Sequence, residues 1–523
     1  MNKLKKTLSI VLAVGSALTL TSLSAFADEP YVSYNYDAWY DAIPSQSGYR
    51  VDQVVSGSGM DLMKLSTAGD ELFLADNASA SISNAKDMFY EPELDEFWIA
   101  DSGNNRILRL DKDLKLVGAY NKLSDSEIPS FNDPSGLYVT VSDGKPVVYI
   151  ADTANARAVR AIVESATVMK SDQEFVKPES ELYKSKTFNP TKILADSGGN
   201  VYAVESSVQQ GAVQFDPNGV FTGFYGANRV EVTAAVIAQQ IWRTFASNEQ
   251  LASMERNVNV EFANFDVDNE GFIYTVTEAA NASQDAVKKL NPAGYNIWNT
   301  NAGNSYKFGD LVEFTTAEVD PHFAIRLTDL VVSDNMNINV LDYESGRIFQ
   351  YDQENNLLFV FGSKNSTSDQ KGTFIAPNAV ESRGDKIYVI DGKKNDITVF
   401  VETQFGQMVH KAAGLYADGR YEEAKGPWEE VLSRDGGYWL AYMGLGKAEL
   451  NAGNYKEAMD YFEYAEADES YDNAYQYYRE EVIAKYFTPA IIVLVVIIIA
   501  IIVLRILFKK GILGKKAKTK GGK

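Results

Sequence analysis

The most constraining feature of this chain is a short strand pattern that recurs at similar intervals. Its clearest copies are residues 97–107 (FWIADSGNNRI) and 148–157 (VYIADTANAR), and their aromatic residues Trp98 and Tyr149 lie 51 positions apart. Self-similarity at a period of roughly 20–50 residues is the mark of an array of similar structural units. The architecture therefore depends on what one unit is and how many are present.

Four further copies occupy residues 200–205, 271–277, 337–342 and 386–391. Each is an apolar run that leads to an acidic or small polar residue, and five of the six copies keep the aromatic residue. Turn residues precede and follow the copies, as in segment 215–219 (FDPNG), and a last strand often closes on an aromatic residue and glycine. Four short strands per unit, repeated about every 50 residues, predict the blades of a β-propeller.

Residues 100–107 of the first copy (ADSGNNRI) resemble the NHL repeat, a family of β-propellers. The motif is specific in the first two copies and decays in the later ones, and the sixth has Asp396 where the first two have arginine. The resemblance implies a mainly β fold with a six-bladed propeller over residues 51–402. Extra strands are expected within residues 51–77, as candidates to complete a blade with the C-terminal end of the domain.

One segment within this domain breaks the β pattern. Around residues 231–257 the apolar residues fall at helical spacing, as at Val232, Val236, Ile237, Ile241 and Phe245. This predicts a helical insertion in a propeller loop. It is either a recognition element or a helix that packs on the rim of a blade.

After residue 402 the apolar period changes from two to about 3.6. Gly419 and Gly453 lie 34 residues apart and are followed at equal offsets by Ala424 and Ala458, then by Trp428 and Phe462. This spacing resembles the tetratricopeptide repeat, in which a glycine allows the turn and small residues let helices approach closely. The resemblance implies a small helical domain over residues 403–485, which either presents a concave face to a protein partner or acts as a spacer.

The two ends of the chain carry targeting signals. Residues 1–27 combine early lysines, an apolar stretch and the small-x-small sequence Ala25-Phe26-Ala27, as in a signal peptide. Residues 486–508 are long and apolar enough for one transmembrane helix, and residues 509–523 form a lysine-rich tail. These signals predict a single-pass protein of the cell membrane with an extracytoplasmic N-terminal domain and a cytoplasmic tail.

Charge and cysteine content narrow the class of protein. The segment 28–487 holds 38 basic and 71 acidic residues, a net charge of −33, which disfavours nucleic acid and anionic lipid as partners. The chain has no cysteine, so disulfides, thiolate metal sites and cysteine nucleophiles are excluded. This combination is typical of a bacterial surface protein.

Candidates for chemistry are few. His322 and His410 are the only histidines and fall in different predicted domains, which disfavours a histidine metal centre. The segment 266–271 resembles the start of a calcium loop, but Thr277 stands where the final carboxylate is needed. The sequence therefore names no catalytic, metal-binding or cofactor-binding residue, and no cofactor is expected.

The acidic residues that end the strand copies allow two interpretations. They would form either a ring of carboxylates around the central channel or hydrogen bonds to backbone donors in the turns leaving their strands. We favour turn chemistry, with Arg106 and Arg157 bracing the same turns. The residues concerned are Asp101, Asp152, Glu205, Asp342 and Asp391.

Aromatic residues crowd the segment 28–50. They would serve either as stacking platforms for sugars or, as we favour, to fasten this terminal segment to the outside of the propeller. The residues concerned are Tyr31, Tyr34, Tyr36, Trp39, Tyr40 and Tyr49.

The sequence as a whole favours a non-enzymatic, membrane-anchored binding or scaffold protein that engages a protein or glycan partner. The architecture is also similar to that of bacterial membrane proteins that accompany carbohydrate transporters, which implies a link to carbohydrate uptake. Two alternatives stay open. One is an extracellular propeller hydrolase or lyase of the lactonase kind, whose ligands form no sequence motif, and the other is a glycan receptor.

Overall fold

The computed structural model describes residues 30–37, 41–67, 72, 74, 78–205, 211–226, 262–278, 286–298, 308–310, 325–365 and 370–510. The predicted signal peptide and helical insertion and residues 511–523 of the predicted basic tail lie outside these residues, as do Trp39, Tyr40 and His322. The chain divides into two compact units, Met1–His410 and Lys411–Lys523.

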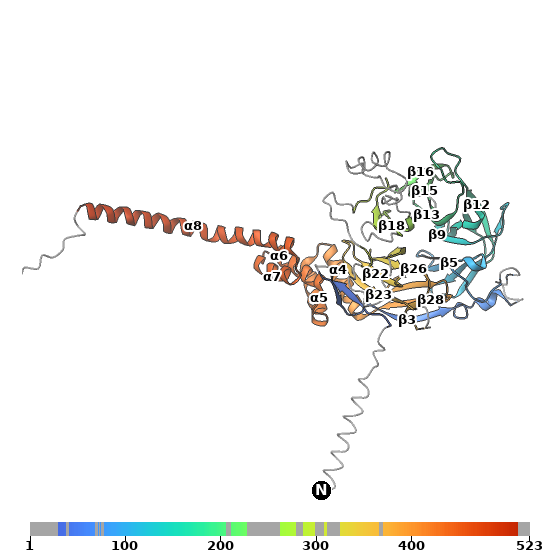
Figure 1. Ribbon diagram of the computed structural model, residues 1–523, viewed down its shortest axis with the longest axis horizontal. Coiled ribbons are helices and arrows are strands. Elements are labelled where there is room, and N and C mark those ends of the chain that lie inside the picture. The colour runs from blue at the N-terminus through green and yellow to red at the C-terminus, as the bar shows by residue number, and fades with distance from the viewer. Residues whose placement is uncertain are drawn as a thin grey trace, which may run out of the picture. The chain divides into compact units, whose positions relative to one another are not determined.

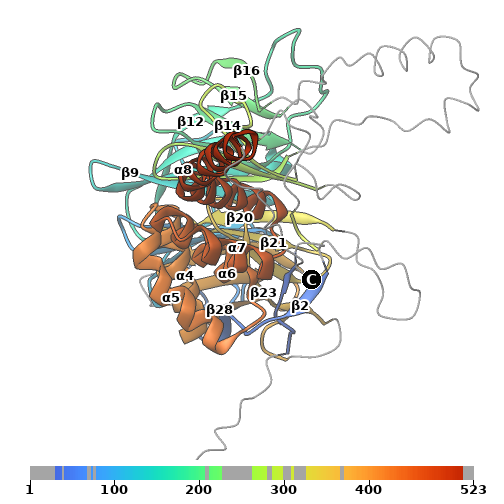
Figure 2. The same ribbon diagram turned by 90° about the vertical axis from the view of Figure 1, so that its left-hand side faces the viewer.

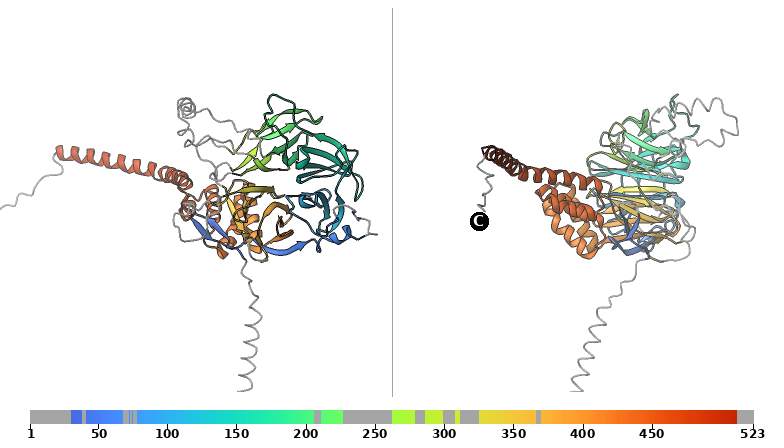
Figure 3. Two further views of the ribbon diagram at one scale, coloured as in Figure 1. Left: turned by 45° about the vertical axis from the view of Figure 1, so that its right-hand side comes forward. Right: turned by 60° about the vertical axis from the view of Figure 1, so that its left-hand side comes forward.

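The first unit is a six-bladed β-propeller (Figures 1 and 3). In blades one to five the main strands pair antiparallel and follow one another along the chain, and the fourth blade has three strands among the described residues. A short parallel strand extends the edge of blade two. The strands of blades one to three are β4 (Asp87–Glu91), β5 (Glu96–Asp101), β6 (Arg106–Asp111), β7 (Leu116–Tyr120), β9 (Pro134–Ser142), β10 (Lys145–Asp152), β11 (Arg157–Val163), β12 (Met169–Phe175), β13 (Pro190–Ala195), β14 (Val201–Glu205), β15 (Ala212–Phe215) and β16 (Phe221–Tyr225). Those of blades four to six are β17 (Phe262–Val267), β18 (Ile273–Thr277), β19 (Val287–Leu290), β20 (Leu327–Val332), β21 (Ile338–Asp342), β22 (Arg347–Tyr351), β23 (Leu357–Phe361), β26 (Pro377–Arg383), β27 (Lys386–Asp391) and β28 (Asp396–Glu402). Three short elements, β8 (Leu123–Ser124), β24 (Ser363–Lys364) and β25 (Thr373–Phe374), lie between blades in the sequence.

The innermost strands close the ring. The first strand of each blade lies against the first strand of the next, in the order β4, β9, β13, β17, β20, β26 and back to β4. The sixth blade takes its outer strand from the other end of the domain, because β3 (Tyr49–Ser56) pairs antiparallel with β28. Figure 1 shows the blue strand β3 alongside the orange strand β28. This confirms the expectation that the start of the domain completes a blade with its C-terminal end.

All six copies of the repeated pattern form the second strand of a blade. Alternate residues of β5 contribute to different clusters of the core: Phe97 and Ile99 pack with blade six, whereas Trp98 and Ala100 pack with blade two. Both faces of a blade are therefore covered by its neighbours. The copies are continuously apolar for this reason, instead of alternating as half-exposed strands do.

The aromatic N-terminal segment is fastened to the outside of the propeller. Strand β1 (Tyr34–Tyr36) pairs with β2 (Ala42–Pro44) and lies against β23, where Ser33 Oγ donates a hydrogen bond to the carbonyl of Val360 at 2.9 Å. Tyr34 and Tyr36 pack into the core between blades four and five, and Tyr31 and Tyr49 are also buried. These four rings cannot serve as exposed sugar platforms, and the fastening interpretation is confirmed for them.

The second unit is helical. It includes the end of α4 (Gln404–Ala417), then α5 (Tyr421–Arg434), α6 (Trp439–Ala452), α7 (Tyr455–Tyr464) and α8 (Asp468–Lys509). Helices α5 to α8 pack consecutively, and Figure 2 shows the first three side by side. A Cβ at Gly444 would lie 2.2 Å from Trp428 and one at Gly446 would lie 2.5 Å from Phe462. Glycine in α6 thus sets how closely its neighbours approach.

Helix α8 is long and apolar enough to cross a membrane. It is continuous for 42 residues and passes through Pro489. Proline removes one backbone donor, but the remaining ladder of hydrogen bonds continues on both sides. One helix therefore includes both the cap of the helical unit and the candidate membrane span.

Candidate functional site

The acidic residues that end the second strands are structural. The carboxylate of Asp101 is fully buried and accepts hydrogen bonds from the backbone N–H of Ser83 at 2.7 Å and from Arg106 Nε at 2.7 Å. Arg106 also donates to the carbonyls of Ser79 and Ser81. Burial raises the pKa of Asp101, and the arginine opposes this shift.

The same arrangement recurs in blade two with Asp152 and Arg157, where the backbone donor is Asn132. In both blades this donor lies before the first strand, whereas the sequence placed it in the turn after the second strand. Each carboxylate therefore fastens the entry of its blade to the exit of the second strand. The prediction of a structural role is confirmed, and these two acids do not line the central channel.

The calcium-like segment also has a structural explanation. Asp268 Oδ1 accepts the backbone N–H groups of Glu270 and Phe272, and its Oδ2 accepts the hydroxyl of Tyr274 and lies 3.3 Å from Lys289 Nζ. Its oxygens stabilise an ordinary turn between the first two strands of blade four.

The channel is shaped by the first strand of each blade. Such a strand pairs on one side only, so the N–H groups on its axial side need other acceptors. Carboxylates from the preceding blade supply them: Asp87 accepts from Leu137 at 2.7 Å, Asp266 from Val332 at 2.8 Å and Asp329 from Val380 at 2.7 Å. The channel acids thus join neighbouring blades.

A register shift in these strands helps to place the polar groups. It occurs in β9, β13, β17, β20 and β26, directly before Gly136, Lys192, Asn264, Asp329 and Ala379 respectively. A bulge of this kind redirects side chains locally. Gly136 is needed where it stands, because a Cβ there would lie 2.6 Å from the carbonyl oxygen of Thr191.

A polar cluster crosses the middle of the channel. Lys192 forms an ion pair with Asp87, and Asn264 donates a hydrogen bond to Asp329. All four side chains belong to buried residues. Coulombic attraction to Asp87 and Asp329 outweighs burial and raises the pKa of Lys192, so this amine stays charged.

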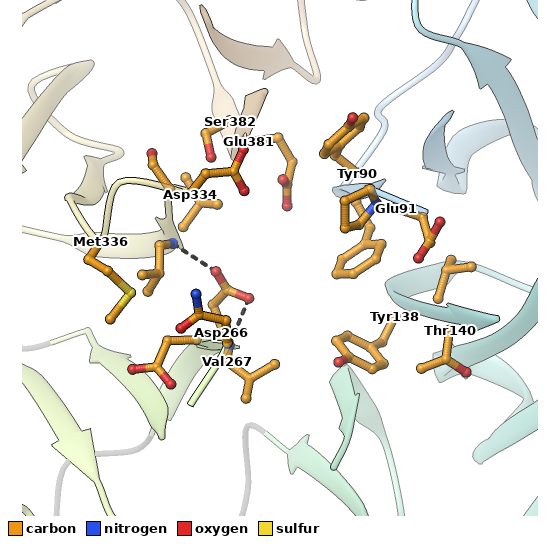
Figure 4. A pocket seen from close by; sticks show the side chains of 18 of the residues that line it. Tyr90, Glu91, Tyr138, Thr140, Asp266, Val267, Asp334, Met336, Glu381 and Ser382 are labelled. Carbon is orange, nitrogen blue, oxygen red and sulfur yellow. Dashed lines mark hydrogen bonds between the residues drawn. The ribbon is translucent and has the colours of Figure 1, made fainter. Parts of the chain in front are cut away.

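A pocket of about 470 Å³ opens above this cluster, at the ends of the first strands. Figure 4 shows Tyr90, Tyr138 and Glu91 on one side of the pocket and Asp266 and Glu381 across from Tyr138. Phe89 also lines the pocket. Asp266 and Glu381 also line a smaller space of about 20 Å³ between the pocket and the polar cluster. The two spaces therefore share part of their lining.

Two of the carboxyl groups at the pocket, those of Asp266 and Glu381, have raised pKa values. Burial raises the pKa of Asp266 to about 6, and burial together with the charges of neighbouring carboxylates raises the pKa of Glu381 well above its ordinary value. Deeper in the channel, burial raises the pKa of Asp329 to about 7, although Lys192 opposes this shift. Asp266 and Asp329 therefore change between the neutral and charged forms near neutral pH, and Glu381 keeps its proton to higher pH than an ordinary glutamate does.

The rim is held by an ion pair. Arg383 bonds to Asp95 through Nε at 2.6 Å and lies over the ring of Tyr90, whose hydroxyl also donates to Asp95 at 2.7 Å. The side chain of Asp95 keeps its charge because these bonds lower its pKa to about 2. Tyr90 is therefore fixed in position at the edge of the pocket.

The described residues contain no group of three or more histidine, cysteine, aspartate or glutamate side chains arranged to hold a metal ion. His410 instead bonds to Glu402 and to Gln350 Oε1, and a buried chain of hydrogen bonds leads from Gln350 through Asn339 to Ser333 at the pocket. The geometry suits binding through charge and aromatic contact.

The sequence did not identify this site. Asp87, Lys192, Asp329 and Glu381 were not singled out, and Asp266 was considered only as part of a calcium loop. The available signal was a charged residue within a short apolar strand, as in PTKILA at 190–195 and LTDLVV at 327–332. Such residues are costly to bury unless paired, so each marks a special position.

No protein-family model and no curated protein matches this sequence. Distant structural likenesses exist to solved propeller proteins. A protein of unknown function from Bacteroides thetaiotaomicron is 13% identical, with a TM-score of 0.40 over 69% of this chain and 77% of its own. Virginiamycin B lyase from Staphylococcus aureus is 12% identical (TM-score 0.36; 59% and 77%), and a luciferin-regenerating enzyme is 11% identical (0.36; 62% and 92%). Likeness this distant transfers neither a site nor an activity.

Proposed function

We propose that this chain is a membrane-anchored binding protein whose propeller engages a protein or glycan partner outside the cytoplasm. The observation that carries the proposal is the pocket on the propeller axis, with an aromatic side and a carboxylate side. Concave sites with a few polar groups on largely preformed walls are the usual form of a ligand site. The hydrogen bonds between the first strands hold these walls in place.

The assignment of the repeats belongs to the same proposal. The shared bonding of Asp101 with Arg106 and of Asp152 with Arg157 supports an NHL-like propeller. In the helical unit, the positive φ angles of Gly419 and Gly453 and the close packing of α6 support tetratricopeptide-like repeats. These helices would offer a second surface to a protein partner or hold the propeller at a distance from the membrane.

The proposed location is testable because the chain has no native cysteine. A single cysteine replacing Asp143, in an exposed turn of blade two, is expected to react with a membrane-impermeant maleimide on intact cells. A single cysteine replacing Lys516 should react only after the membrane is opened. Labelling of Lys516→Cys on intact cells would contradict the proposed orientation.

The proposed binding site is testable by photo-crosslinking in intact cells. A benzophenone amino acid in place of Met336, at the pocket, is expected to capture a specific partner. The matched control replaces Val176, an exposed residue just after the outer strand of blade two, and should not capture it. Equal capture at both positions would refute a site at the pocket. A link to carbohydrate uptake further predicts that a component of a carbohydrate transporter is among the captured proteins.

One observation favours an extracellular hydrolase or lyase as a second candidate. The pKa of Asp266, about 6, is in the range useful for a general acid or base, and Glu381 is displaced in the same direction. Turnover of a lactone or glycoside panel that is lost in Glu381→Gln, with the fold retained, would establish this candidate. Activity that is retained in Glu381→Gln would show that Glu381 is not a catalytic residue.

A further inference from the structure

The charges along the channel are unbalanced. Lys192 pairs with Asp87 and Lys289 pairs with Asp268. Seven carboxyl groups line the pocket or the space below it, those of Asp87, Glu91, Asp266, Asp268, Asp329, Asp334 and Glu381. The amine of Lys192 is committed to Asp87 in the polar cluster. Asp266 and Glu381, two of the five acidic residues that line the pocket, therefore have no cation of their own among the described residues that line it.

The opposite side of the pocket presents aromatic rings. The rings of Phe89 and Tyr138 pack together with centroids 4.9 Å apart, and Tyr90 is fixed by Asp95 and Arg383. The quadrupole of an aromatic ring makes the electrostatic potential over its face negative, so the face attracts cations, and the attraction strengthens where water is partly excluded. A cation in this pocket would thus meet an aromatic side and a carboxylate side at once.

The net charge of the whole segment 28–487 also favours a cationic ligand. The segment 28–487 has a net charge of −33, which attracts a cationic partner over long distances and raises its association rate. A neutral sugar would gain nothing from this field. The strong cation at the rim, Arg383, is paired with Asp95 and does not compensate the pocket floor.

We infer that the pocket binds a basic side chain, lysine or arginine, presented by a protein partner. This inference rests on the proposed binding function and specifies its ligand class. The ammonium or guanidinium group lies between the Asp266–Glu381 side and the Phe89–Tyr138 side. A volume of about 470 Å³ leaves room for the residues that flank the basic side chain, as expected for an exposed peptide segment. Because the incoming cation favours the ionised carboxylates, binding releases protons near neutral pH.

The test measures binding of a fluorescent tetralysine peptide, capped at both ends, to the full chain in uncharged detergent. Saturable binding is expected, with at least tenfold weaker binding when the lysines are acetylated. Glu381→Gln should weaken binding by roughly tenfold to a hundredfold, since it removes a charged partner. The control Glu127→Gln makes the same charge change at an exposed surface position and should have little effect.

A second pair of variants tests the aromatic side. Tyr138→Phe keeps the ring and should bind normally, whereas Tyr138→Leu should lose roughly threefold to tenfold in affinity. Calorimetry of the wild-type chain in two buffers of different ionisation enthalpy should show proton release at pH 6–7, and Glu381→Gln should reduce it.

The outcomes separate this inference from the proposed function. Equal binding of acetylated and free peptide, or equal affinity of Glu381→Gln and Glu127→Gln, would overturn the cationic ligand. If the Met336 crosslinker still captures a partner in that case, binding at the pocket stands and its ligand is of another class. Competition by a neutral oligosaccharide, without effect of lysine, would identify a glycan site instead.

Discussion

Replacing Asp266 by asparagine should change protein stability in opposite directions at high and low pH. The pKa of Asp266 is about 6 in the folded chain, against an ordinary value of 3.8. The folded state therefore keeps this proton to higher pH than the unfolded chain does. Stability from this group is fully present below about pH 4 and is lost as pH rises through about 6.

The magnitude follows from the size of the shift. About two pKa units correspond to about 3 kcal/mol, and partial access of water through the pocket reduces this to about 2 kcal/mol. Asparagine avoids this cost at high pH. It also replaces one of the two oxygens that accept the N–H groups of Val267 and Val332 by an amide NH₂, a loss of about 1 kcal/mol at any pH. Asp266→Asn should thus stabilise the chain by about 1 kcal/mol at pH 8 and destabilise it by about 1 kcal/mol at pH 4.

The assay is urea unfolding of the full chain in uncharged detergent at pH 4, 6 and 8, followed by the fluorescence of tryptophan, including the fully buried Trp98. Asp143→Asn is the matched control, because Asp143 is exposed and its φ of 51° suits asparagine. Its unfolding midpoint should follow the wild type at every pH. A difference between Asp266→Asn and wild type that does not vary with pH would refute the explanation by burial of a charge.

Three further substitutions test the fold around the site. Arg106→Met should lower the free energy of unfolding in urea by about 3–5 kcal/mol, because it leaves Asp101 buried without its cation. Adding Asp101→Asn should restore part of this loss, and an effect of Arg106→Met below about 1 kcal/mol would contradict the structural role of the ion pair. Lys192→Met removes the cation of the channel, so the melting temperature should fall more at pH 8 than at pH 5, and an equal fall would show that this charge does not matter. Gly444→Ala places a Cβ 2.2 Å from the indole ring of Trp428 and should speed proteolysis of the helical unit. The control Gly414→Ala, whose Cβ meets no atom within 4 Å, should not, and equal rates of proteolysis would contradict the close packing of α6.

The hydrogen-bond path between the pocket and α4 shows how far the tertiary structure reaches beyond the sequence pattern. Its members Ser333, Asn339, Gln350 and His410 come from three strands or strand ends and a helix, and the separation of Gln350 from His410 is 60 residues. No local periodicity records such a path, because each polar residue finds its partner only after the blades have assembled.

The number of blades could be predicted from the amino-acid sequence alone. The second strand of each blade is covered on both faces, so burial forces every copy to be apolar. The acidic residue and arginine that follow in the first two copies fasten the entry of the blade to the exit of this strand. Residues that form local structure must satisfy local chemistry, and this chemistry is visible in a single copy. The same reason made the helical turns at Gly419 and Gly453 predictable, since their positive φ angles favour glycine.

The residues that line the propeller axis could not be predicted, because they come together only when the blades assemble. Asp87, Lys192, Asp266, Asp329 and Glu381 occur on five different first strands and share no spacing in the sequence. They meet because closure of the ring directs the unpaired edges of these strands toward one point, where backbone donors need acceptors and carboxylates need a cation. The repeat specifies the scaffold, and the departures from it on the inner strands create the site.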